Sequence, residues 1–229
     1  MKICGLQKLT LLDYPGHLAC TVFLGGCNFK CPYCYNTPLI SLNECKEYIS
    51  EDELLAFLDT RKGILKGVAI TGGEPLINKD IKSLILKIRE KGFKVKLDTN
   101  GSYPEALENL IEEGLVDYVA MDVKNTYEKY DFTIGAHVKI ENIKRSINIL
   151  LQNKVDYEFR TTIIKEFHEI EDFEEIGKML NGARQYFLQS FQDKYSVHGH
   201  FNPMTKEELE ECRKRAQRYV PNITIRGID

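Results

Sequence analysis

The sequence lacks several features that would place it in a membrane or on nucleic acid. Its formal net charge is only −3 over 229 residues, and its lysines and arginines form no basic stripe, so electrostatic capture of nucleic acid is not expected. The longest apolar runs, such as 18–24 and 116–119, are far shorter than the roughly 20 residues that cross a bilayer. Residues 1–12 lack the basic and apolar segments of a signal peptide. We therefore expect a cytoplasmic protein with no membrane and no nucleic-acid partner.

The cysteines are more informative than these absences. Seven are present, and with no secretion signal a reducing compartment is expected, where clustered cysteines more often bind metal or do redox chemistry than form disulfides. Four are scattered along the chain, and each is predicted to be a small buried apolar side chain. These four are Cys4, Cys20, Cys45 and Cys212.

The pattern of short β-rich runs and helical segments indicates repeated βα units and a parallel sheet. The candidate strands are 17–24, 67–71, 93–98, 117–123, 156–164 and 184–189. Six units of about 30 residues fit this length, whereas a closed eight-stranded barrel needs about 250 residues. We expect one α/β domain, 1–229, built as an open partial (β/α)6 barrel. Residues 1–16 would form a small β extension, 17–190 the six βα units, and 191–229 a helix and an edge strand at 223–225.

Helix starts and buried faces are also signalled. Between 79 and 91 the apolar residues Ile81, Leu84, Ile85 and Ile88 recur at helical spacing, so one face of that helix should pack on the sheet. Three helices are predicted to begin at capping boxes. The pairs are Ser50 with Glu53, Ser102 with Glu105, and Thr205 with Glu208.

The main chemical feature is a group of three cysteines, Cys27, Cys31 and Cys34, directly after the first predicted strand. Three thiolates can hold three corners of a 4Fe-4S cluster and leave the fourth iron open to a reaction partner. A structural zinc site is the alternative, but zinc usually takes four protein ligands and no nearby residue completes the set. An ordinary ferredoxin-type site also needs four cysteines, and Cys45 lies eleven residues further on in a predicted loop.

The C-x3-C-x-aromatic-C spacing, with Tyr33 at the aromatic position, resembles the hallmark of the radical S-adenosylmethionine (SAM) superfamily. This resemblance implies that the methionyl amine and carboxylate of SAM chelate the open iron. It also implies that an electron from the cluster breaks a C–S bond to give a 5'-deoxyadenosyl radical. The protein would aim this radical and keep water away from it.

A pair of glycines follows the second predicted strand, where barrel folds place their chemistry. Gly72 and Gly73 allow the backbone to approach a ligand closely, although a simple strand-to-helix turn would use them too. Together with Glu74 they resemble the GGEP segment of the superfamily, which binds the methionyl amino group. We therefore expect these three residues at the cofactor.

Polar residues also close the third and fourth strands, and an arginine lies within the fifth. Without the resemblance, they would be turn and helix-capping residues. The resemblance to glycyl-radical-enzyme activases implies a small monovalent cation beside SAM, surrounded by carboxylates and a hydroxyl, and a lysine that reaches the ribose. An unpaired buried charge is costly, so an arginine on an apolar strand is predicted to contact the SAM carboxylate or ribose. The residues are Asp98, Thr99, Asn100, Asp122 and Lys124, and the arginine is Arg160.

The N-terminal run 9–16, followed by 23–28, resembles one branch of the activating proteins of anaerobic ribonucleoside-triphosphate reductase. The resemblance implies a glycyl radical enzyme as partner and a flavodoxin- or ferredoxin-type electron donor. Tyr35 stands where these activases usually have histidine; with Tyr33 and Cys34, it is predicted to lie beside the cofactor. A radical enzyme acting on a small molecule is the alternative, and a non-catalytic electron carrier is a third interpretation. Gln189, Gln192, His198 and His200 either line the cofactor site or form an exposed polar loop.

Overall fold

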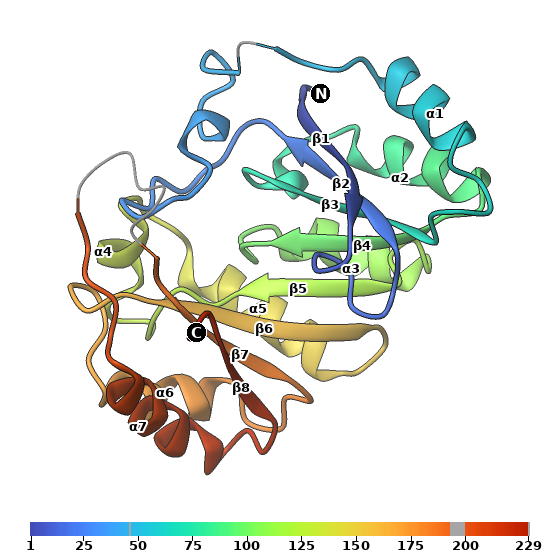
Figure 1. Cartoon of the computed structure of the whole chain (residues 1–229). Helices are drawn as coiled ribbons and strands as arrows, with labels where there is room; N and C mark the ends of the chain where they lie inside the picture. Colours follow the sequence, from blue (N-terminus) through green and yellow to red (C-terminus); the bar gives the residue numbers. More distant parts are fainter. Residues whose placement is uncertain (46, 193–199, 229) are drawn as a thin grey trace.

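Eight strands form one sheet in chain order in the computed structural model, which describes residues 1–45, 47–192 and 200–228 (Figure 1). The first two strands pair antiparallel and every later pair is parallel. The strands are β1 (Ile3–Thr10), β2 (Ala19–Leu24), β3 (Gly67–Gly72), β4 (Lys94–Thr99), β5 (Tyr118–Asp122), β6 (Asp156–Ile163), β7 (Tyr186–Ser190) and β8 (Ile223–Arg226). Strands β1 and β8 end the strand order, so the sheet is open. The predicted α/β partial barrel is confirmed, with β1 as its N-terminal extension and β8 as its edge strand.

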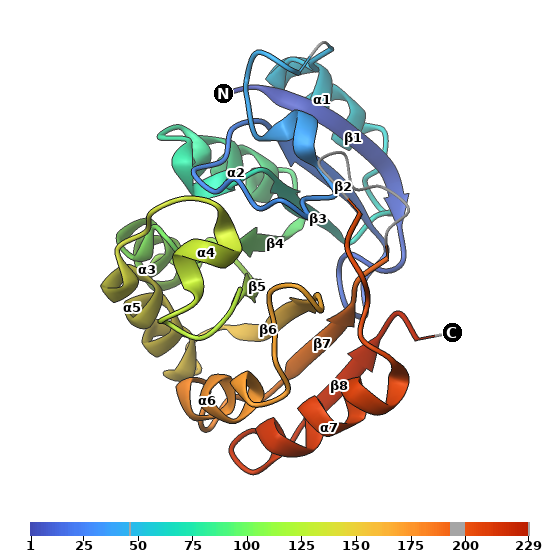
Figure 2. The same ribbon diagram turned by 90° about the vertical axis from the view of Figure 1, so that its left-hand side faces the viewer.

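The helices lie on the outer side of the curved sheet, except α4, which lies at the carboxyl ends of the strands beside Lys30 (Figure 1 and Figure 2). They are α1 (Glu51–Asp59), α2 (Ile81–Glu90), α3 (Pro104–Glu112), α4 (Tyr130–Ile134), α5 (Ile140–Leu151), α6 (Asp172–Met179) and α7 (Lys206–Gln217), with 3-10 turns at Thr37–Leu39 and Pro75–Ile77. The predicted apolar face of α2 is fully or almost fully buried. None of the helices in the described part of the chain is long and apolar enough to cross a membrane.

Two of the three predicted capping boxes are present, at the starts of α1 and α7. The third prediction, Ser102 with Glu105, is wrong, because α3 begins at Pro104 and has no side-chain cap. The Ser102 hydroxyl instead donates to Asn100 Oδ1 at 2.6 Å. Proline is favoured in the first turn of a helix because its missing N–H is not needed there, so α3 starts without a cap and leaves Ser102 to the preceding loop.

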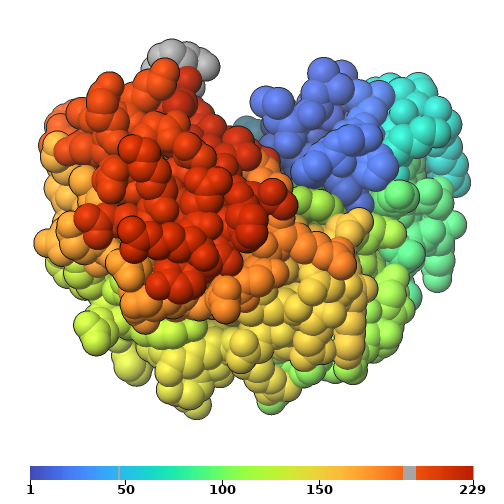
Figure 3. Space-filling model, turned by 90° about the horizontal axis from the view of Figure 1, so that it is seen from below, coloured from blue at the N-terminus to red at the C-terminus, as the bar shows by residue number. Residues whose placement is uncertain are grey.

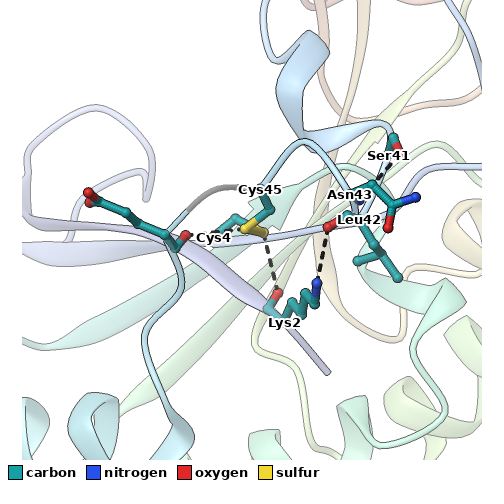
Figure 4. Close-up of a disulfide and its surroundings, with 7 residues drawn as sticks. Lys2, Cys4, Ser41, Leu42, Asn43 and Cys45 are labelled. Carbon is teal, nitrogen blue, oxygen red and sulfur yellow. Dashed lines mark hydrogen bonds between the residues drawn. A yellow bond between two sulfur atoms is a disulfide. The ribbon is translucent and has the colours of Figure 1, made fainter.

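The prediction for the scattered cysteines is half right. Cys20 and Cys212 are fully buried, but Cys4 and Cys45 form a disulfide, with Cα atoms 5.7 Å apart (Figure 4). The Ile49 N–H donates to the Ile3 carbonyl at 2.8 Å, so the chain after the cysteine motif returns to β1 and brings the two thiols together. Forty-one residues separate the pair, and nothing in the local sequence signals their contact.

The concave face of the sheet is polar near the carboxyl ends of its strands. Side chains alternate along a strand, so charged residues two apart on β4 and β6 point to the same side. Lys96 and Glu158 are each only 2% exposed, and Asp122 on β5 pairs in register with Arg160 on β6. The inside of the open barrel therefore carries ion pairs and a cavity beside its apolar core.

Candidate active site

A cavity of about 640 Å³ lies at the carboxyl ends of the strands, a volume typical of small-molecule sites. It is lined by the three motif cysteines and by every other predicted site residue except Glu74. Those lining residues are Tyr33, Tyr35, Gly72, Gly73, Asp98, Thr99, Asn100, Asp122, Lys124 and Arg160. Segments far apart in the sequence thus meet around one space, as expected for parallel strands whose carboxyl ends share an edge of the sheet.

The cysteine loop leaves β2 and is held by the segment after it. Gly26 N donates to Leu39 O at 2.8 Å, and Cys27 N donates to Ile40 O at 3.1 Å. Within the loop, Cys34 N donates to Cys31 O at 3.1 Å. These backbone bonds fix the loop while leaving all three thiols on the cavity wall.

The cavity wall offers three thiols, whereas a structural zinc site usually takes four protein ligands. Three thiolates suit a 4Fe-4S cluster with one open iron. The Tyr33 hydroxyl is buried in the same wall and has no hydrogen-bond partner among the described residues, so it remains available to a bound group.

Burial keeps the thiols neutral in the protein without a cluster. It raises the pKa of Cys27 to about 12 and that of Cys31 to about 11, and it also raises the pKa of Cys34. Iron binds thiolates, so loading the cluster must release these protons and supply the charge that stabilises the thiolate form.

The two glycines at the end of β3, Gly72 and Gly73, are needed first by the cysteine loop itself. A Cβ at Gly73 would lie 2.1 Å from the Gly26 carbonyl oxygen, and a Cβ at Gly72, where φ is +123°, would lie 2.2 Å from the Leu24 oxygen. Such distances are impossible without moving backbone. Glu74 N also donates to Gly26 O at 2.8 Å. The sequence predicted that the backbone at these glycines approaches a ligand closely. The structure shows that it also lies close to the backbone next to Cys27.

Glu74 lies behind the cavity wall rather than on it. Its carboxylate is fully buried and accepts from Leu76 N at 3.0 Å, from the Thr99 hydroxyl at 2.9 Å and from Asn100 N at 2.6 Å. The Asn100 amide in turn donates to Asn28 Oδ1 in the cysteine loop at 3.0 Å. Glu74 thus ties the ends of β3 and β4 to the cysteine loop, which makes it a positioning residue.

Asp98 and Asp122 are both held ionised. Burial acts to raise their pKa values, but nearby cations outweigh it. Arg160 and Lys96 hold the pKa of Asp98 below its ordinary range, and Arg160 and Lys124 do the same for Asp122. The wall thus presents permanently charged groups to a ligand in the cavity.

Comparisons with known proteins agree with this geometry. Residues 21–180 match the radical SAM superfamily. The chain belongs to this superfamily. Over 235 residues it is 37% identical to a Methanocaldococcus jannaschii protein named "Putative glycyl-radical enzyme activating enzyme", covering 99% of this chain and 96% of that one. It is 26% identical over 201 residues to 7-carboxy-7-deazaguanine synthase of Aquifex aeolicus, covering 87% and 80%. A solved radical SAM methyltransferase from Sphaerobacter thermophilus superposes with a TM-score of 0.69 at 17% identity, covering 95% and 68%, which supports the fold alone.

Membership implies that this radical SAM enzyme carries a 4Fe-4S cluster and binds SAM.

Tyr35, which stands where the activases that this chain resembles usually have histidine, joins the cysteine loop to the end of β7. Its ring stacks on Phe191 with centroids 5.6 Å apart, and its hydroxyl accepts from Gln192 N at 2.8 Å. Gln189 and Gln192 line the cavity; His200 is exposed and does not line it, and His198 lies outside the described residues.

Further cavity residues, not predicted from the sequence, lie on the two edges of the sheet. Gln7 on β1, Asp13 and Thr21 lie on one side, and Arg226 on β8 lies on the other. The Arg226 guanidinium sits 3.2 Å from the centre of the Phe187 ring and 3.4 Å from the buried Glu158 carboxylate. One signal in the sequence could have revealed the buried ionic residues. A charged residue stands two positions before a predicted site residue in two strands, with Lys96 before Asp98 and Glu158 before Arg160.

Proposed function

We propose that this radical SAM enzyme is an activase that generates a glycyl radical on a partner enzyme, an anaerobic ribonucleoside-triphosphate reductase. The observation that carries the proposal is the 37% identity to a named activating enzyme over 99% of the chain. The resemblance of the run 9–16 and of the segments after β3, β4 and β5 to activases points the same way.

In this proposal the cavity residues have separate roles. Cys27, Cys31 and Cys34 would hold the 4Fe-4S cluster, which when bound supplies the electron that cleaves SAM reductively. Gly72 and Gly73 would present backbone groups to the methionyl amine, and Asp122 and Lys124 would face the ribose. The buried walls would keep water and stray hydrogen donors away from the reacting atoms.

The partner's glycine would reach the cavity between the two edge strands. Gln7 on β1 and Arg226 on β8 both line the cavity, although these strands stand at opposite ends of the sheet. In Figure 3 a hollow separates the N-terminal segment, in blue, from the C-terminal segment, in red. An opening on this side suits an extended peptide loop. We further propose a flavodoxin- or ferredoxin-type protein as the electron donor.

Electron paramagnetic resonance tests the activase proposal. The reconstituted enzyme, dithionite and SAM are incubated anaerobically with a glycyl radical enzyme from the same organism. We expect a doublet, because the one remaining α-hydrogen splits the signal, and we expect no doublet with the Cys34→Ala variant. No doublet with any such enzyme from the organism would refute the proposal.

A radical SAM enzyme acting on a small molecule is the second candidate. The 26% identity to 7-carboxy-7-deazaguanine synthase over 87% of this chain favours it, because that relative's name describes the synthesis of a small molecule. Stoichiometric release of 5'-deoxyadenosine on adding a metabolite, without any glycyl radical enzyme, would support this candidate over the first.

A further inference from the structure

The two carboxylates predicted to surround a monovalent cation already pair with lysine and arginine side chains. Asp98 is the last residue but one of β4, Asp122 ends β5 and Arg160 lies beside Asp122 on β6. Arg160 Nε donates to Asp122 Oδ1 at 2.9 Å and Arg160 Nη1 donates to Asp98 Oδ2 at 3.3 Å. The guanidinium therefore bridges the two carboxylates.

The two remaining carboxylate oxygens are also paired. Lys96 Nζ donates to Asp98 Oδ1, and Lys124 Nζ donates to Asp122 Oδ2 at 3.0 Å. All four oxygens thus face a side-chain cation. A small hard cation binds through oxygen ligands, and here it would have to share each of these oxygens with an ammonium or guanidinium group that repels it.

The charge balance also opposes an additional cation. Three cations, Lys96, Lys124 and Arg160, surround two carboxylates, and the nearby buried carboxylate of Glu158 is itself paired with Arg226, which leaves one excess positive charge in this group. The side chains of both aspartates and of Arg160 are largely buried, at 17%, 30% and 15% exposed, so solvent screens this charge only weakly. A further positive ion would be repelled.

We propose that Arg160 takes the place of the cation in this enzyme, so that SAM binds without sodium or potassium. Two negative charges side by side need a counter-charge that contacts both. A guanidinium is planar, always charged and carries several donors, so it can bridge two carboxylates where a lysine ammonium usually pairs with one. Arg160 would thereby hold Asp122 and its neighbour Lys124 in position for the cofactor.

The first test is a salt series on the wild-type enzyme. The affinity of the reconstituted protein for SAM is measured by equilibrium dialysis in potassium, sodium, lithium or tetramethylammonium chloride at equal ionic strength. We expect the dissociation constants to agree within about twofold. A tenfold or greater tightening by sodium or potassium would overturn the proposal, and this result does not depend on any variant folding.

The second test removes the arginine. Arg160→Met keeps the approximate length of the side chain, and we expect it to bind SAM at least tenfold more weakly in tetramethylammonium and to recover part of that loss in potassium or sodium. The melting temperature of the cluster-free variant should likewise rise on adding these ions, while that of the wild type should not. Arg145→Met, at an exposed arginine on α5 that pairs with Glu108, is the matched control.

Two outcomes of the second test would contradict the proposal. An Arg160→Met variant with wild-type affinity in every salt would show that the bridge is dispensable. An equal loss of affinity in all four salts would show that Arg160 contacts SAM directly and does not replace a cation.

Discussion

Glu74 offers a quantitative test of the network behind the cavity. Burial raises its pKa from 4.5 to about 7, even though three donors stabilise the carboxylate. Because the folded-state pKa is raised, the stability that this group contributes is fully present below pH 4.5 and is lost as the pH rises through 7. The shift corresponds to about 3 kcal/mol of unfolding free energy.

Glu74→Gln removes this titration. The difference in unfolding free energy between variant and wild type should therefore move by about 3 kcal/mol in favour of the variant between pH 4 and pH 8. For a chain of this length that equals a relative shift in melting temperature of about 6 to 12 °C. The glutamine side chain also turns an N–H donor toward the N–H and O–H groups that donate to Glu74 in the wild type. This disturbs the network that positions the cysteine loop, so we expect the variant to bind SAM more weakly at every pH.

Urea unfolding of the cluster-free proteins, followed by far-ultraviolet circular dichroism across this pH range, measures the effect. Glu90→Gln, at an exposed glutamate that ends α2, corrects for the loss of a carboxylate in general. A difference between Glu74→Gln and wild type that does not vary with pH would refute the reasoning.

Three further predictions concern the loops around the cavity. Replacing any one of Cys27, Cys31 or Cys34 by alanine should abolish the brown colour and SAM cleavage, whereas Cys20→Ala and Cys212→Ala should keep both. Gly73→Ala should lose most cluster absorbance as well as SAM binding, because its Cβ meets Gly26 O at 2.1 Å; Gly5→Ala, whose Cβ meets nothing closer than 3.5 Å, should lose neither. Replacing Cys4 and Cys45 together by serine should lower the unfolding free energy by about 4 kcal/mol, given a 41-residue loop, and leave cluster loading intact. An unchanged urea midpoint, or a colourless double variant, would contradict this last prediction.

The sequence predicted the strands well because each is a short β-rich run bounded by turns. The predicted range 67–71 stops one residue before the end of β3, and the range 93–98 begins and ends one residue before β4. The site was predictable for the same reason, since parallel strands bring their carboxyl ends to one edge. Contacts that depend on distant segments could not be read in this way. The Cys4–Cys45 disulfide and the Arg160 bridge depend on how the chain returns to β1 and on the register of β5 with β6, which no local pattern encodes.

The role of Glu74 shows a second limit of sequence reasoning. The GGEP segment predicted cofactor contact for Gly72, Gly73 and Glu74, but a motif does not say which side of a wall each side chain occupies. The structure buries Glu74 against Thr99 and Asn100 and leaves Gly72 and Gly73 on the cavity side.

The transfer of deuterium from the partner's glycine to 5'-deoxyadenosine tests whether the enzyme abstracts a hydrogen atom from a glycine of another protein. A glycyl radical enzyme labelled with α-deuterated glycine is incubated with the reduced enzyme and SAM, and the product is analysed by mass spectrometry. We expect one deuterium in 5'-deoxyadenosine, formed in step with a glycyl radical signal whose doublet splitting collapses because the remaining α-position carries deuterium. Unlabelled 5'-deoxyadenosine accompanying that radical signal, or label acquired only from a deuterated metabolite, would contradict the activase proposal.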